Sequence, residues 1–166
     1  MNYFELFEIP VQLKVDAKNL SKRFFELSKK YHPDYFANTD EATQADVLDK
    51  SALLNKAWKT FQSPDETIKY VLQQKNLLEE EEKYELPPDF LMEVLEINEA
   101  LMDMDDSGDL KLKIDQLQNE IYAPVKEIVE DYKDSAVSKE ELLQVKEYYY
   151  KKKYLDRIRR QLAGMA

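Results

Sequence analysis

The 166-residue sequence contains no cysteine and a single histidine, His32. Without cysteine, the chain has no disulfide bond, no thiolate nucleophile and no thiolate metal ligand. One histidine is too few to build a site that holds a transition metal through nitrogen and sulfur ligands. We therefore expect no metal site and no bound cofactor in this chain.

Glycine and proline are also scarce, with two and six residues respectively. Few positions therefore favour tight turns between β-strands, and the abundance of Glu, Lys and Leu favours helices. No apolar run approaches the roughly 18 residues that a membrane-spanning helix requires. The first residues, MNYFELFEIP, lack the basic and apolar regions of a signal peptide. We predict an all-α protein that stays in the cytoplasm and does not bind membranes.

Basic residues are outnumbered by acidic ones, and the imbalance lies in the second half of the chain. The sequence has 24 Lys and Arg against 34 Asp and Glu, which gives a net charge of −10. Residues 1–75 hold 11 of each kind, so residues 76–166 carry the whole excess. Because nucleic-acid binding depends on basic residues that face phosphates, we expect no nucleic acid as a ligand. An acidic surface can instead attract a basic protein.

Apolar residues recur at helical spacing in the first half of the chain. Steps of three and four residues predict one helix from about Asp16 to Lys30 and a second from about Glu41 to Phe61. A third helix is expected to start after Ser63. The first two helices are separated by about ten residues, which favours an antiparallel hairpin with the only histidine in its connection.

The second half of the chain begins with a segment rich in glutamate and proline. It contains four consecutive glutamates and a double proline, and this composition is typical of a linker between domains. Helical patterns follow over about 88–104, over about 110–132 with a kink at Pro124, and from residue 138 onward. Three helices with short connections predict a three-helix bundle. The predicted boundaries are 1–75 for the first domain, 76–87 for the linker and 88–166 for the bundle.

The histidine lies in the stretch KKYHPDYF, where Pro33 and Asp34 follow it directly. A His–Asp pair can act in acid–base catalysis, but no paired nucleophile and no glycine-rich phosphate loop accompanies it. A plainer alternative is that both side chains satisfy the backbone at a helix end. The tripeptide by itself favours this plainer alternative.

The surroundings of the tripeptide resemble the J-domain of DnaJ-like co-chaperones. A short N-terminal turn, YFELFEIP, is followed by a helix with a basic face, then by YHPD and a long second helix. In that family, the tripeptide and the basic face dock on an Hsp70 chaperone and stimulate its ATPase in trans, so the resemblance implies no catalytic residue in this chain. The Hsp70-binding residues that it implies are His32, Pro33, Asp34, Lys22, Arg23, Lys29 and Lys30.

The residue after the tripeptide departs from the family pattern. Tyr35 stands where many J-domains have a lysine or an arginine. We therefore expect weaker electrostatic steering toward an Hsp70 partner than a basic residue would provide.

The stretch FLMEVLEINEALMDMD, residues 90–105, carries more apolar surface than a bundle helix needs. One buried stripe is sufficient for such a helix. A second stripe, with Leu91, Leu95 and Met102, lies about 100° round the helix beside acidic residues. It forms either a binding surface for a partner or part of one broad core-facing surface, and periodicity favours neither. The first stripe consists of Phe90, Val94, Ile97, Leu101 and Met104.

Three stretches together resemble the HscB family of iron–sulphur cluster co-chaperones: NYFELFEIP, FLMEVLEINEAL and YLDRIRRQL. The resemblance implies a bacterial, cytoplasmic protein with an N-terminal J-domain and a C-terminal three-helix bundle in an L-shaped arrangement. It implies that the bundle binds the scaffold protein IscU and delivers it to the specialised Hsp70 HscA, which supports iron–sulphur cluster assembly and transfer. The scaffold-binding residues that it implies are Leu91, Met92, Leu95, Glu96, Glu99, Asp103 and Tyr154.

Other functions are compatible with the same sequence. A J-domain protein that serves another client would not bind IscU through Leu91 and Leu95. A helical adaptor with a degenerate J-domain would not stimulate an Hsp70 ATPase. The stretch YYYKKKY, residues 148–154, has the composition of an RNA-stacking surface, but on a helix its side chains point in all directions.

Overall fold

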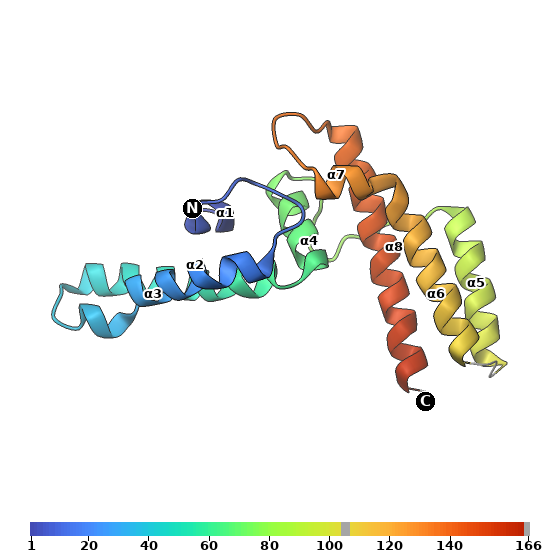
Figure 1. The fold of residues 1–166 in the computed structure, drawn as a ribbon, viewed down its shortest axis with the longest axis horizontal. Helices are drawn as coiled ribbons and strands as arrows, with labels where there is room; N and C mark the ends of the chain where they lie inside the picture. Colours follow the sequence, from blue (N-terminus) through green and yellow to red (C-terminus); the bar gives the residue numbers. More distant parts are fainter. Residues whose placement is uncertain (104–106, 165–166) are drawn as a thin grey trace. The chain divides into compact units, whose positions relative to one another are not determined.

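The computed structural model describes residues 1–103 and 107–164, and every regular element in these ranges is a helix (Figure 1). The prediction of an all-α chain is confirmed. Within the described ranges, no helix has both the length and the apolar character needed to span a membrane. The chain divides into two compact units, Met1–Val71 and Leu72–Ala166. The finer boundaries at residues 75 and 88 and the L-shaped arrangement stay predictions.

The first unit is a helical hairpin on which a short N-terminal helix packs (Figure 1). Both predicted hairpin helices are confirmed. The connection between them contains a short 3-10 helix rather than an open loop. In chain order, the helices are α1 (Tyr3–Phe7), α2 (Ala17–Lys30), η1 (Pro33–Phe36), α3 (Glu41–Phe61) and α4 (Pro64–Gln74), of which α4 continues into the second unit.

Helix caps and aromatic packing hold the hairpin together. The carboxylate of Asp16 accepts hydrogen bonds from the first backbone N–H groups of α2, as an N-cap does. Phe24 of α2 stacks on Trp58 of α3, with ring centroids 4.7 Å apart. The ring of Phe61 lies 5.3 Å from that of Phe7, which joins α1 to the end of α3. These contacts fix the two long helices against each other and thereby position the connection between them.

The second unit is a three-helix bundle, as predicted (Figure 1). The pattern over 110–132 is interrupted at Pro124, where a 3-10 turn replaces the α-helix because proline has no N–H to donate. The helix predicted over 88–104 ends at Met102, and Met104 lies outside the described residues. The helices are α5 (Pro88–Met102), α6 (Ser107–Tyr122), η2 (Ala123–Val125), α7 (Lys126–Glu130) and α8 (Lys139–Gly164).

The segment before α5 packs along α8 instead of extending freely into solvent. Glu82 forms a 2.7 Å ion pair with Lys146, and this contact lowers the pKa of the Glu82 carboxyl. Tyr84 stacks on Tyr150, with ring centroids 4.5 Å apart. The ammonium group of Lys146 also lies 5.7 Å from the centroid of the Tyr84 ring. The glutamate-rich stretch predicted to be a linker is therefore fastened to the bundle of the second unit.

Candidate partner-binding surfaces

The tripeptide His32-Pro33-Asp34 forms a compact turn between α2 and α3. His32 is the N-cap of η1, and its Nδ1 accepts a hydrogen bond from the backbone N–H of Asp34 at 3.2 Å. The backbone N–H of Tyr35 donates to the carbonyl of His32 at 3.1 Å. Because Nδ1 is the acceptor, a neutral His32 ring carries its proton on Nε2. The ring can then donate this N–H to another molecule.

Both ionisable side chains of the turn are open to solvent. The His32 side chain is 53% exposed and the Asp34 side chain is 88% exposed. The separation of 3.6 Å between His32 Nδ1 and Asp34 Oδ2 is longer than a hydrogen bond. The carboxylate of Asp34 therefore remains available, and its two oxygens suit a bidentate contact with an arginine.

Gln44, in the first turns of α3, holds the end of this connection. Its Nε2 lies 3.3, 3.0 and 3.1 Å from the carbonyl oxygens of Phe36, Ala37 and Thr39. These contacts tie the end of the connection to α3, and the carbonyl of Phe36 also accepts hydrogen bonds from the N–H and the hydroxyl of Thr39. Gln44 could not be identified from the sequence, because an exposed glutamine near a helix start has no distinctive pattern. Its role becomes apparent only from the folded structure of the connection between α2 and α3.

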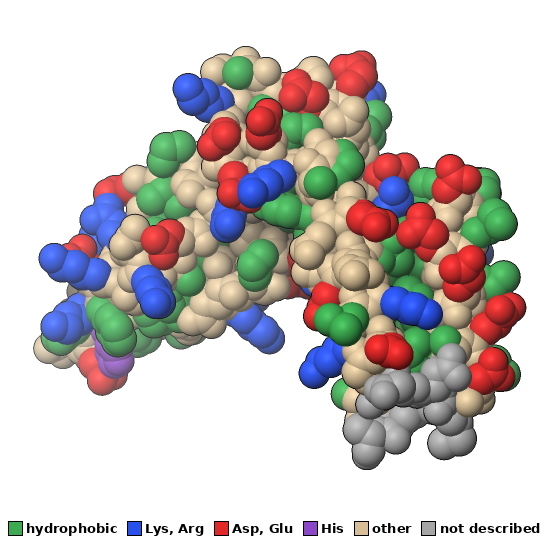
Figure 2. All heavy atoms as spheres, turned by 45° about the vertical axis from the view of Figure 1, so that its right-hand side comes forward, with side chains coloured by type: hydrophobic (Ala, Val, Ile, Leu, Met, Phe, Trp, Pro, Cys, Tyr) green, Lys and Arg blue, Asp and Glu red, His purple; other side chains and the backbone are tan. Residues whose placement is uncertain are grey.

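Exposed lysines lie along α2. Lys22, Lys29 and Lys30 are all exposed, and Figure 2 shows Lys and Arg side chains gathered near the single histidine. Arg23 differs, because its guanidinium group pairs with Glu8 and its Nε donates to the carbonyl of Phe7. Arg23 therefore fastens α2 to the end of α1, and it has fewer donors left for a partner than the lysines have.

One face of α5 is buried in the bundle and another is exposed. Phe90, Val94 and the other described members of the first apolar stripe are buried. By contrast, Leu91 is 44% exposed, Met92 is 68% exposed and Leu95 is 56% exposed. The alternative that both stripes form one core-facing surface is therefore wrong.

Acidic side chains border this exposed apolar surface. Glu96, Glu99 and Asp103 are all exposed on α5 or at its end, and Figure 2 shows acidic and apolar side chains next to one another over the bundle. We call these three acidic residues together with Leu91, Met92 and Leu95 the α5 face. An apolar centre with a polar border is the usual composition of a protein–protein interface.

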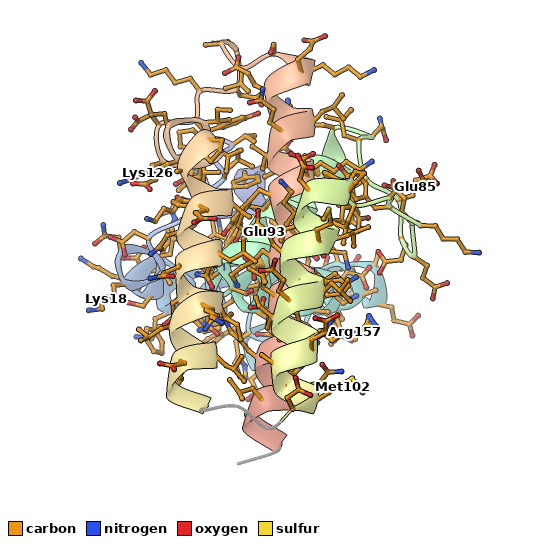
Figure 3. All side chains as sticks on the ribbon, turned by 90° about the vertical axis from the view of Figure 1, so that its right-hand side faces the viewer. Lys18, Glu85, Glu93, Met102, Lys126 and Arg157 are labelled. Carbon is orange, nitrogen blue, oxygen red and sulfur yellow. The ribbon has the colours of Figure 1, made fainter. Side chains whose placement is uncertain are left out.

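Tyr154 lies on α8, beside a groove between α5 and α8. Its half-buried ring packs edge-on against Phe90 at a centroid distance of 6.3 Å. The guanidinium group of Arg157 lies 5.6 Å from the centroid of the Tyr154 ring. The groove has a volume of about 710 Å³ and is also lined by Met102, which lies near Arg157 in Figure 3. The structure thus places Tyr154 across this groove from α5.

The helical hairpin with an exposed His-Pro-Asp turn is the arrangement that the resemblance to J-domain co-chaperones implies, and a three-helix bundle follows it. Residues 86–163 match the family described as the HSCB C-terminal oligomerisation domain. Over 124 residues, the chain is 33% identical to the co-chaperone protein HscB homolog of Photobacterium profundum, and the match covers 74% of this chain and 72% of that protein. The chain belongs to the HscB family of co-chaperones.

Solved structures of HscB proteins have the same fold. The crystal structure of human co-chaperone protein HscB matches with a TM-score of 0.78 and 24% identity, over 98% of this chain and 81% of that chain. Chaperone HscB from Vibrio cholerae matches with a TM-score of 0.65 and 25% identity, over 99% of this chain and 97% of that chain. The helical fold that the resemblance implies is confirmed by these matches.

Proposed function

We propose that this protein binds the scaffold protein IscU and delivers it to the Hsp70 HscA, whose ATPase it stimulates. The α5 face and Tyr154 bind the scaffold, and the His-Pro-Asp turn with the lysines of α2 docks on the Hsp70. The observation that carries the proposal is the uncovered apolar centre of the α5 face, because a bundle helix has no need of it. Membership of the HscB family supports the same assignment.

The His-Pro-Asp turn suits docking because its conformation is restricted before binding. Pro33 fixes its own φ angle, and the hydrogen bond between Asp34 N–H and His32 Nδ1 closes the turn. A restricted turn loses less conformational entropy when it binds. Asp34 then accepts hydrogen bonds from a cationic group of the partner, and hydrolysis of ATP takes place entirely in the Hsp70.

The α5 face suits a scaffold surface that combines apolar and basic groups. Leu91, Met92 and Leu95 provide apolar area at the centre, where interface residues contribute most to affinity. Glu96, Glu99 and Asp103 attract basic groups during approach and exclude partners with acidic surfaces. Iron–sulphur cluster transfer is the process that this delivery serves.

The setting that we propose is the cytoplasm of a bacterium. A relative in Photobacterium profundum supports the bacterial assignment. We propose no catalytic residue, metal site or cofactor in the chain itself, and no nucleic acid or membrane among its partners. Its activity consists of bringing two other proteins together.

The proposed function is tested by the steady-state ATPase rate of an HscA-type Hsp70. The rate is measured for the Hsp70 alone, with IscU, with this protein and with both. We expect the largest rate with both, because the scaffold and the J-domain then reach the Hsp70 as one complex. Stimulation that IscU does not increase would indicate another client, and no stimulation at all would indicate an adaptor without an Hsp70 partner.

We expect Gln44→Ala to impair Hsp70 stimulation in part. Loss of the contacts to Phe36, Ala37 and Thr39 frees the end of the connection, so docking must order it again. We expect the concentration for half-maximal stimulation to rise about fivefold, because one side chain's hydrogen bonding contributes on the order of 1 kcal/mol. Gln12→Ala is the matched control, since Gln12 also donates to a backbone carbonyl, that of Pro10. Equal effects of the two changes would contradict a specific role for Gln44.

A further inference from the structure

The solvent-facing side of α2 carries an aromatic ring as well as lysines. Phe25 is 65% exposed, whereas the neighbouring Phe24 stacks on Trp58 inside the hairpin. A single exposed ring is ordinary on a protein surface. Phe25 is distinguished by its basic neighbours and by its position on the helix that leads into the His-Pro-Asp turn.

Basic residues border Phe25 on both sides along the helix. Lys22 lies three positions before it and Lys29 lies four positions after it, which places all three on one side of α2. Lys18, seven positions before Phe25, lies on the same side of the helix. We call Lys18, Lys22, Phe25 and Lys29 the α2 row. All three lysines are exposed. The row therefore has an aromatic centre and a basic border, and aromatic residues at the centre of protein–protein interfaces contribute strongly to affinity.

The turn adjoining this row carries a second exposed aromatic ring. Tyr35 is 72% exposed and packs edge-on against His32, with ring centroids 5.9 Å apart. At this position a basic side chain would add charge, whereas Tyr35 adds apolar area and a hydroxyl group. The chain thus presents aromatic surface at two places along the α2 row and its adjoining turn.

We propose that Phe25 and Tyr35 are apolar anchors for the Hsp70-type partner, and that the lysines of α2 form the charged border of the same contact. The surface of the partner would then combine acidic residues with an apolar depression. This inference rests on the proposed function, because it assigns a role within Hsp70 docking. The basic border of the α2 row suits an acidic partner surface, and α2 leads directly into the His-Pro-Asp turn, which the proposed function assigns to Hsp70 docking.

The two parts of the contact respond differently to salt. Attraction between exposed charges weakens as the Debye length shrinks, whereas burial of an aromatic ring does not depend on charge. A docking surface made of lysines alone would lose nearly all of its affinity at high salt. A surface with an aromatic anchor keeps the part of its affinity that comes from burial of the ring, because salt does not weaken that part.

The test compares full-length variants in the ATPase assay with a cognate HscA-type Hsp70, at ionic strengths of about 0.05 M and about 0.5 M. We expect Phe25→Gln to raise the concentration for half-maximal stimulation about tenfold at both salt concentrations, as loss of an interface anchor does. We expect the effect of Lys22→Glu to be large at low salt and small at high salt. Phe25→Leu, which keeps apolar area, should stay within about threefold of the wild type.

Controls separate this inference from general damage to the surface. Leu48→Gln removes an apolar side chain that is 59% exposed, similar to Phe25, but that lies on α3 outside the α2 row, and we expect it to have no effect on stimulation. Because Phe25 is exposed, its replacement should leave the melting temperature unchanged, which a circular-dichroism melt checks. His32→Gln reports on the proposed function independently of Phe25.

The outcomes distinguish failure of the inference from failure of the proposed function. If His32→Gln is inactive but Phe25→Gln stimulates like the wild type at both salt concentrations, the inference is wrong and the proposed function stands. If the wild type does not stimulate, or His32→Gln stimulates fully, the proposed function is wrong and the inference falls with it. A wild-type dimer that Phe25→Gln dissociates without loss of stimulation would overturn the inference and identify the α2 row as a contact between copies of this chain.

Discussion

His32→Gln and Asp34→Asn are each expected to reduce stimulation of the Hsp70 ATPase at least tenfold and to leave the fold intact. A loss of this size is roughly what removal of a strong polar contact at the centre of an interface causes. Both side chains lie in an exposed turn, so neither change creates a cavity or an unpaired buried charge. Asp34→Asn keeps the size of the side chain and removes the charge that strengthens a hydrogen bond to an arginine. His32→Gln removes the ring and its Nε2–H donor. ATPase rates and circular-dichroism melts measure the two expectations separately.

A matched control removes one exposed carboxylate elsewhere in the same unit. Asp49 is exposed on α3, so Asp49→Asn changes the net charge by the same amount as Asp34→Asn. We expect this control to stimulate like the wild type. A folded Asp34→Asn protein with full stimulation would remove the turn from the docking mechanism.

Replacement of Leu91 and Leu95 together by alanine is expected to weaken scaffold binding by about 2 kcal/mol or more, which corresponds to a rise in Kd of about 30-fold or more. Both side chains are about half exposed in the free protein, so their loss should scarcely change its stability. If they were buried, each replacement would cost roughly 2–5 kcal/mol of folding free energy. A calorimetric melt and a titration with IscU therefore give opposite results for the two cases.

Two further leucines provide controls for this double variant. Leu112 is 60% exposed on α6, and Leu112→Ala should change neither scaffold binding nor stability. Leu155 is fully buried in the bundle, and Leu155→Ala should lower the melting temperature clearly. A melt of the double variant that resembles the melt of Leu155→Ala would show that Leu91 and Leu95 stabilise the fold.

The helices and the composition of both surfaces could be predicted from the sequence, because these features depend on local patterns. The spacing of apolar residues located α2 and α3. Periodicity also separated the buried stripe of α5 from Leu91 and Leu95. It did not determine whether the second stripe was exposed, because that depends on which helices pack against α5.

Contacts between residues far apart in the sequence could not be predicted. The pairing of Arg23 with Glu8 follows from the packing of α1 on α2, and it leaves the guanidinium group of Arg23 fewer free donors for a partner. The ion pair between Glu82 and Lys146 joins the glutamate-rich segment to the last helix of the chain. The charge composition of the glutamate-rich segment indicated a linker, because composition does not show that a residue of α8 pairs with Glu82.

Delivery of a scaffold by one chain is tested most directly by mixing two full-length variants that each lack one surface. His32→Gln keeps the α5 face, and the double variant at Leu91 and Leu95 keeps the His-Pro-Asp turn. With IscU and an HscA-type Hsp70 present, we expect that the mixture does not restore the wild-type ATPase rate, because the gain in effective concentration requires both surfaces on one chain. Restoration of the wild-type rate by the mixture would contradict delivery by a single chain.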